Sequence, residues 1–440
     1  MLAVGLAAIA AAFLVRVHVM PTLPPSAVTE TAAEASPEVA ALLHEADEVG
    51  RRMLAEFPQS LDALNVMAML HARFGDQDDA IAYWERCLEK DPHFARAHFH
   101  IGLIAHERGD NAEASKHFAR ATEIDNALSN YPVHWAKSLT NEGKLEEAAE
   151  VLRADLARHP DSVASLTILG DTYLQLKEEA QAKACYERVV ELAPEVTSAH
   201  YGLGMACSKL GEVDAAKAHL ARFKELKKED EQAHREELKT EELGLVRARK
   251  SVAEILTTAA KGYVFRGDTE RAGTLLRRAR QLSPSLSEAS RVLAWLYERQ
   301  GRVEEALATL SEFVERVDDD AAAYLRLAKL QAQVGDLEGA EESFRRLTRL
   351  VPNEASAYAM LGEFQLHVRE DAKEARTAAA KAVELDPTAA PHYFLLAMAC
   401  WESGDSEAAA EAVDQAIALA PDNDEYRRLR ATISGRQGAH

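Results

Sequence analysis

The sequence predicts an all-α protein, built as a solenoid of about ten stacked helical pairs that follow an N-terminal apolar helix. Three markers share a period of about 34 residues. Glycine stands in the turn of most units, and proline closes most of them. Small alanines, which let two helices cross closely, recur at Ala80, Ala114, Ala148, Ala182, Ala216, Ala272, Ala306, Ala340, Ala375 and Ala409. Three independent markers with one period indicate a repeat.

The clearest unit is the segment Val163–Val196. Its apolar and small residues have helical spacing on both sides of a short polar turn, so two amphipathic helices would bury them against each other. These residues are Leu166, Leu169, Gly170, Tyr173, Ala182, Tyr186 and Val189, with Pro194 closing the unit.

Composition excludes some classes of ligand. The 440 residues include 51 Lys plus Arg against 72 Asp plus Glu, a formal charge of −21. So acidic a chain repels phosphate backbones and anionic lipid surfaces, which argues against nucleic acid as the main ligand. The four cysteines, Cys87, Cys185, Cys207 and Cys400, form no CxxC motif, so neither a disulfide framework nor a zinc knuckle is expected.

Residues 1–20 are apolar from Leu2 to Val15 and are then interrupted by Arg16 and His18. The stretch is just long enough to cross a bilayer, and no small-x-small cleavage site follows it. We therefore expect an uncleaved N-terminal membrane anchor. A cleaved signal peptide and a buried or interfacial helix are the alternatives. A large domain after such an anchor is usually exported, although Arg16 favours retention, so we expect export of the repeat domain.

The remaining boundaries follow from composition and register. We expect a proline-containing linker over residues 21–37, a capping half-repeat over 38–60, and a first array of five repeats over 61–227. A charged helical insertion over 228–252 then separates a second array of five repeats, 253–421, and a capping helix over 422–440 follows. The insertion reads as a solvated helix. Leu238, Leu245 and Val252 are seven residues apart, so a coiled-coil partner is the alternative.

The period and pattern resemble the tetratricopeptide (TPR) repeat, W-x2-L-G-x2-Y…A-x3-F…P, over roughly residues 61–421. The large first position is filled by Leu64, Leu166, Leu256, Tyr324, Tyr358 and Tyr393, and the small eighth position by Ala68, Gly102, Ala136, Gly170, Gly204, Ala260, Ala294, Ala328, Gly362 and Ala397. The unit that begins at Ser129 departs from the pattern, with Pro132 at the large position and Asp155 at a small buried one. The resemblance implies a right-handed superhelix whose first helices line a concave groove for peptides or partner helices.

The groove positions of the first array mix apolar, cationic and amide side chains, a set that suits a peptide ligand. They are Asn65, Met69, Arg96, Phe99, Leu103, His106, Asn130, His134 and Lys137. The alternative is that these are ordinary surface residues. The Lys/Asn set with which some family members bind a C-terminal carboxylate is not reproduced at the matching positions.

No residue set makes a case for chemistry. The histidines between His93 and His106 lack an HExxH motif, and His98 occupies a packing position, so it is expected to be a core ring and no metal site is predicted. Gly202-x-Gly204 lies inside a predicted helix with no preceding strand, so helix packing explains it better than a dinucleotide loop. No nucleophile elbow or P-loop occurs in a suitable context, and no cofactor is expected.

We therefore predict a membrane-anchored, non-enzymatic scaffold that binds a protein or peptide in its groove and organises a complex. The alternative is a soluble accessory subunit of an assembly or biogenesis machine, or a regulator of a catalytic partner in trans. Neither nucleic acid nor a small-molecule substrate is expected as a ligand.

Overall fold

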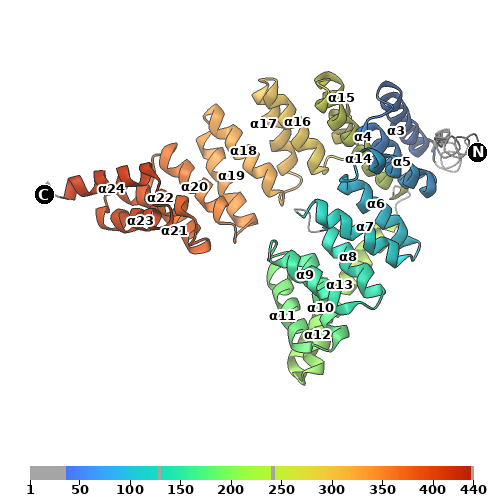
Figure 1. The fold of residues 1–440 in the computed structure, drawn as a ribbon, viewed down its shortest axis with the longest axis horizontal. Coiled ribbons are helices and arrows are strands. Elements are labelled where there is room, and N and C mark those ends of the chain that lie inside the picture. Colours follow the sequence, from blue (N-terminus) through green and yellow to red (C-terminus); the bar gives the residue numbers. More distant parts are fainter. Residues whose placement is uncertain (1–35, 127–129, 239–242, 438–440) are drawn as a thin grey trace, which may run out of the picture. The chain divides into compact units, whose positions relative to one another are not determined.

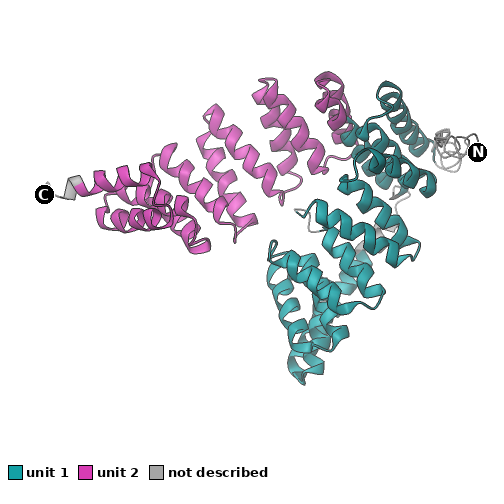
Figure 2. Ribbon diagram, viewed as in Figure 1, with its two compact units in different colours: residues 1–259 teal, residues 260–440 magenta. Residues whose placement is uncertain are grey.

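The computed structural model describes residues 36–126, 130–238 and 243–437, and every regular element in these ranges is an α-helix. The chain forms two compact units, residues 1–259 and 260–440 (Figure 2), and we describe each by itself. The boundary between the units falls inside one long helix, Leu243–Phe265. The predicted all-α solenoid is confirmed for the described residues.

From residue 37 to residue 238, the first unit is a series of antiparallel helices in which each packs against the next (Figure 1). Its helices are α3 Pro37–Glu56, α4 Leu61–Phe74, α5 Gln77–Lys90, α6 Ala95–Glu107, α7 Asn111–Ile124, α8 Asn130–Asn141, α9 Leu145–Leu156, α10 Val163–Leu176, α11 Glu179–Leu192, α12 Thr197–Lys209, α13 Val213–Leu238 and the first part of α14 Leu243–Phe265.

The second unit continues the same pattern from the end of α14. Its helices are α15 Thr269–Leu282, α16 Ser287–Arg299, α17 Val303–Val314, α18 Ala321–Val334, α19 Leu337–Leu350, α20 Ala355–His367, α21 Ala372–Leu385, α22 Ala390–Glu402, α23 Ser406–Leu419 and α24 Asp424–Gln437.

The turns inside the helical pairs depend on left-handed backbone. Gly109 has a φ of +81°, and six further glycines have values between +75° and +87°. An aspartate after such a glycine often caps the second helix, as where the Glu113 N–H donates to Asp110 Oδ1 at 3.1 Å. The fourth pair uses Lys177 at φ +62° instead of glycine, and Gly75 of the first pair does not adopt the left-handed conformation. The repeat therefore tolerates more than one turn geometry.

The ten periodic alanines are the points of closest helix contact. None of their side chains is more than 5% exposed. We expect Ala182→Leu to lower the free energy of unfolding by about 1–3 kcal/mol, because the added carbons have no space at this crossing. The control is Ala180→Leu, at an exposed position of the same helix. Equal thermal denaturation midpoints for the two variants would contradict the assigned register.

The segment between the predicted arrays forms the end of α13 and the beginning of α14. Side chains from Lys227 to Glu231 in α13 are exposed, as expected for a solvated helix. In α14, however, Leu245, Ala248 and Val252 are buried. Their spacing of three and four residues makes one buried apolar face on the helix. The charges that surround them in the sequence lie on the other faces of the helix.

The predicted membrane anchor, residues 1–20, lies outside the described residues. Within the described ranges, no helix combines the length and the apolar character that a bilayer crossing requires. The two longest, α13 and α14, carry charged side chains along their length. On this finding, the predicted localisation, a membrane-anchored and exported repeat domain, is wrong. The predicted association with a membrane through the N-terminal helix is wrong for the same reason.

Candidate functional site

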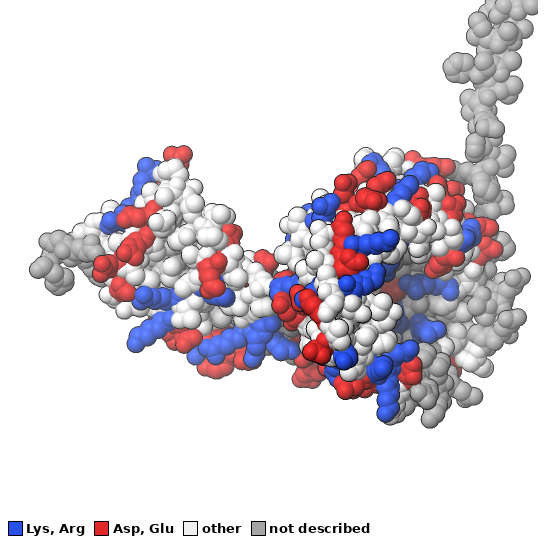
Figure 3. Space-filling view, turned by 90° about the horizontal axis from the view of Figure 1, so that it is seen from below, with Lys and Arg blue, Asp and Glu red and all other residues white. Residues whose placement is uncertain are grey.

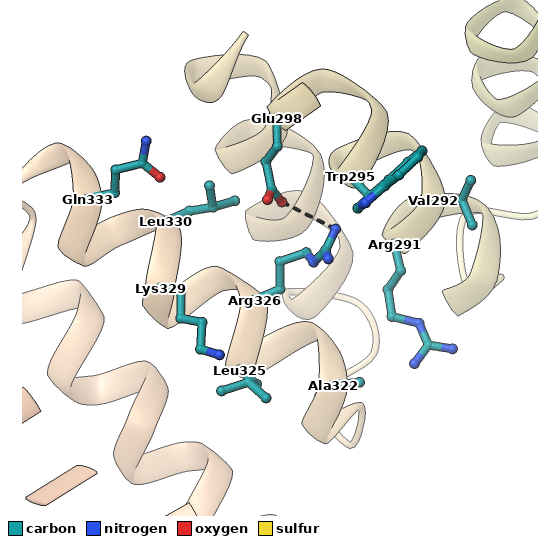
Figure 4. Close-up of a pocket in the computed structure, with 10 residues that line it drawn as sticks. All are labelled: Arg291, Val292, Trp295, Glu298, Ala322, Leu325, Arg326, Lys329, Leu330 and Gln333. Carbon is teal, nitrogen blue, oxygen red and sulfur yellow. Dashed lines mark ion pairs between the residues drawn. The ribbon is translucent and has the colours of Figure 1, made fainter. Parts of the chain in front are cut away.

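A cleft of about 520 Å³ lies between α16 and α18 in the second unit (Figure 4). Both are first helices of their pairs, and the cleft lies on the face that lines the groove in the predicted register. The lining residues are Arg291, Val292, Trp295 and Glu298 of α16, and Ala322, Leu325, Arg326, Lys329, Leu330 and Gln333 of α18. Two successive repeats thus build one continuous recess.

An ion pair crosses the cleft from helix to helix. Arg326 Nη1 lies 3.3 Å from Glu298 Oε1, and the two side chains point toward each other in Figure 4. Glu298 Oε1 is nevertheless buried without an aligned hydrogen bond. The Arg326 guanidinium beside this oxygen offsets the cost of its burial, so Glu298 holds Arg326 in place at the cleft.

The other two cations of the cleft, Arg291 and Lys329, differ in whether they form an ion pair. Arg291 Nη1 lies 3.7 Å from Oδ1 of Asp320, the N-cap residue of α18. Lys329 is exposed and has no hydrogen-bond or ion-pair partner among the described residues. The Lys329 ammonium is therefore the cation most readily offered to a negatively charged ligand.

Apolar side chains accompany these charges. Trp295 is half-buried, and the Arg299 guanidinium lies 5.3 Å from the centroid of its ring. Val292 and Leu325 are also half-buried in the cleft lining. An indole with an accessible face beside aliphatic groups can take up an aromatic or aliphatic side chain of a ligand.

The cleft is locally cationic in an acidic chain. Three cations, Arg291, Arg326 and Lys329, line it against one carboxylate, Glu298, whereas the chain as a whole has a formal charge of −21. On the face drawn in Figure 3, basic and acidic side chains are intermingled. A short recess with excess positive charge therefore favours an acidic segment over a basic one.

The structure places the predicted groove residues of the first array in several different environments. Asn65 is buried, and Trp84 Nε1–H donates to its Oδ1 at 3.0 Å. Its Nδ2 lies 3.8 Å from Sδ of the partly buried Met69. Asn65 therefore accepts the hydrogen bond of a buried indole and does not present its amide to a ligand.

Phe99 and His134 are brought together, but in a packed cluster. Their ring centroids are 5.3 Å apart, and Phe99 also lies 4.6 Å from Tyr131. Phe118 contacts both Phe99 and His134 from α7. Burial is the largest cause that lowers the pKa of His134, followed by Lys137 and His106. These rings pack α6, α7 and α8 together. This structural role explains the presence of the rings without a ligand.

The remaining predicted residues lie around this cluster. Leu103 and His106 are partly buried, and His106 Nδ1 is 3.2 Å from Ser138 Oγ. Three residues are exposed: Arg96, Asn130 and Lys137. Lys137 is close enough to Asp171 to lower its pKa, although burial has the larger effect and raises it.

The sequence analysis named groove residues only in the first array, but the same repeat register applied to the second array identifies the cleft. Arg291, Trp295, Leu325 and Lys329 occupy the groove positions of α16 and α18. In the sequence, these positions could have been recognised by their large side chains and their excess positive charge.

Within the described ranges, no group of three or more His, Cys, Asp or Glu side chains surrounds one point where a metal ion could bind.

Models of the tetratricopeptide repeat match the chain in several places. The matched segments are 65–128, 180–231 and 325–390 for one model, 266–324 and 369–433 for a second, and 163–196 for a third. Together they extend over more than half of the chain. The chain belongs to the TPR family. The predicted membership of the TPR family is thereby confirmed.

Individual relatives of this TPR chain are distant. Human Superkiller complex protein 3 is 25% identical over 58% of this chain and 16% of its own length. The Drosophila melanogaster protein O-mannosyl-transferase Tmtc3 is 25% identical over 27% of this chain and 13% of its own length. A crystal structure of MamA protein aligns with 40% of this chain and 94% of its own, at 20% identity and a TM-score of 0.35. The TPR chain thus spans a small part of the two curated relatives.

Proposed function

We propose that this protein is a non-enzymatic scaffold that binds a protein partner by accepting an extended segment in the cleft between α16 and α18. The observation that carries the proposal is that one cleft combines an unpaired cation, Lys329, with apolar side chains, Trp295 and Leu325. Extended peptides offer backbone N–H donors, side-chain charge and apolar side chains together.

The cleft defines the chemistry of that segment. A carboxylate of the partner would pair with the Lys329 ammonium and extend toward Arg291. An aromatic or aliphatic side chain would lie against Trp295 and Leu325. The preferred ligand is therefore an acidic segment with one large apolar residue.

We also propose the exposed part of the first-array set as a second contact surface. Arg96, Asn130 and Lys137 present two cations and an amide on α6 and α8. The buried and ring-packed members of the set support this surface from below.

A peptide array tests the proposed ligand class. We expect the intact protein to prefer peptides in which one aromatic or aliphatic residue is flanked by Asp and Glu over peptides flanked by Lys and Arg. Lys329→Glu should reduce or reverse this preference, because it removes the free cation and adds a repulsive charge. Trp295→Ala should weaken binding of both peptide classes by about 1–3 kcal/mol.

The matched control is Lys373→Glu, at an exposed position of α21 that does not line the cleft. It should leave the peptide preference unchanged. A preference for basic peptides in the unaltered protein, or an equal loss in Lys373→Glu and Lys329→Glu, would rule out the cleft as the binding site.

A further inference from the structure

Two histidines of the second repeat face each other across a helical pair. His98 lies on α6 and His117 on α7, and their Nδ1 atoms are 3.0 Å apart. Both rings are half-buried, and they line a cleft of about 370 Å³ together with Pro92, Lys116 and Arg120. The pair is thus close to solvent but fixed by the packing of two helices.

The other nitrogen of each ring is already committed. His98 Nε2 lies 3.3 Å from the Pro92 carbonyl oxygen, and His117 Nε2 lies 3.1 Å from Glu113 Oε1. A carbonyl oxygen and a carboxylate oxygen only accept hydrogen bonds, so each Nε2 must carry the proton that it donates. A neutral imidazole has only one N–H. Both Nδ1 atoms therefore present lone pairs to each other at 3.0 Å.

Two lone pairs at this distance repel unless a positive centre lies between them. We propose that the His98–His117 pair binds a divalent transition-metal ion of the zinc, copper and nickel class through its two Nδ1 atoms. Metal–nitrogen bonds of about 2.0–2.1 Å place two adjacent ligand nitrogens about 2.8–3.0 Å apart in square-planar geometry and about 3.3–3.4 Å apart in tetrahedral geometry. The observed separation of 3.0 Å matches the square-planar value.

The surroundings have the character of a metal site. In protein metal sites, a ligating imidazole usually donates its second N–H to a carbonyl or carboxylate, which fixes the ring and raises its basicity. Pro92 and Glu113 occupy these two roles here. The neighbouring cations are paired, since Lys116 Nζ lies 3.0 Å from Glu113 Oε1 and Arg120 Nη1 lies 2.9 Å from Glu123 Oε2. Water would complete the coordination from the cleft.

The chain contains a natural comparison three repeats later. His200 on α12 and His219 on α13 have Nδ1 atoms 3.2 Å apart, and His200 Nε2 lies 3.0 Å from the Pro194 carbonyl oxygen. Four residues before His219, however, stands Ala215 in place of a carboxylate. His219 is therefore free to donate from Nδ1, and a simple hydrogen bond satisfies this pair. We expect it to bind the metal more weakly.

Metal titration of the full chain tests the assignment. Zn²⁺ is added in competition with a chromogenic chelator, and the tightest site is compared among variants. His98→Gln and His117→Gln each keep a polar group near the Nε2 position but remove Nδ1, so each should abolish that site. Glu113→Gln should weaken it by about 10- to 100-fold. His219→Gln is the matched control and should leave it unchanged.

The electron paramagnetic resonance spectrum of stoichiometric Cu²⁺ reports the ligands of the metal directly. The unaltered chain should show two coordinated imidazole nitrogens, and His98→Gln should show a changed spectrum. A tightest site unchanged in His98→Gln, or lost in His219→Gln, would overturn the proposal. Failure of Zn²⁺ and Cu²⁺ to bind would do the same, and would assign the space between the rings to a shared proton. None of these results depends on peptide binding at α16 and α18.

Discussion

Acidification from about pH 7 to about pH 4.5 is expected to destabilise the first unit more than the second. His71 and His100 belong to the first unit, and burial is the main cause that lowers the pKa of each ring, for His100 to about 4. His71 is fully buried with neither ring nitrogen hydrogen-bonded, and His100 stacks on Trp84 at 4.8 Å beside Arg73 and Arg96.

The direction follows from proton binding. In the unfolded chain these rings take up a proton near their ordinary pKa of 6.5, whereas in the folded unit they resist it. The unfolded state therefore binds more protons below pH 6.5, and the free energy of unfolding falls as the pH falls. For His100 the loss develops between pH 6.5 and about 4 and amounts to about 2–3 kcal/mol. In the second unit, His367 is exposed and His392 lies in the first turn of α22, so no comparable enclosed pair exists among its described residues.

Hydrogen exchange of the intact chain can resolve the two units, with a chelator present and rates corrected for intrinsic pH dependence. Peptides from α4 to α8 should lose protection at a higher pH than peptides from α16 to α20. His100→Phe keeps a flat ring against Trp84 but cannot be charged, so it should reduce the acid sensitivity. His367→Gln, at an exposed position, should not change it. Equal loss of protection in both units would contradict the assignment to buried histidines.

The repeat architecture was predictable because its determinants are local and periodic. Ala182 is one of ten alanines spaced by helix crossings, and all ten are buried. The turn glycines give a second local signal, since seven of them adopt the left-handed backbone that ends a helix. Lys177 shows the limit of that signal, because a lysine adopts the same conformation.

The environments of individual groove positions were not predictable, because they depend on neighbours distant in sequence. Asn65 occupies a groove position, but the Trp84 indole from the next helix requires its amide oxygen. Leu245 and Val252 lie in a charged segment, yet both are buried on one face of α14. In the second array the groove positions did form a recess, since Trp295 and Leu325 from two helices leave space between them.

Replacement of Tyr186 by alanine is expected to cost about 3–5 kcal/mol in the free energy of unfolding. The ring is fully buried between α10 and α12. It fits there because both neighbouring helices carry glycine: a Cβ on Gly170 would lie 2.7 Å from the ring and one on Gly202 only 2.3 Å. The phenol also donates to Asp171 Oδ1 at 2.6 Å, so Tyr186→Phe should lose about 1 kcal/mol of hydrogen bonding alone.

A double-mutant cycle shows whether the glycines exist to admit this ring. Gly202→Ala should cost about 1–3 kcal/mol by overpacking, although alanine is the better helix former. In a Tyr186→Ala background the same change should cost nothing or stabilise, because the clash is gone and a cavity is partly filled. Gly244→Ala, where an added Cβ meets no atom within 4 Å, should stabilise by up to about 1 kcal/mol and serves as the control. Urea denaturation midpoints are measured for the unaltered chain and the four variants. Additive effects of Tyr186→Ala and Gly202→Ala would show that the tyrosine ring does not require these glycines.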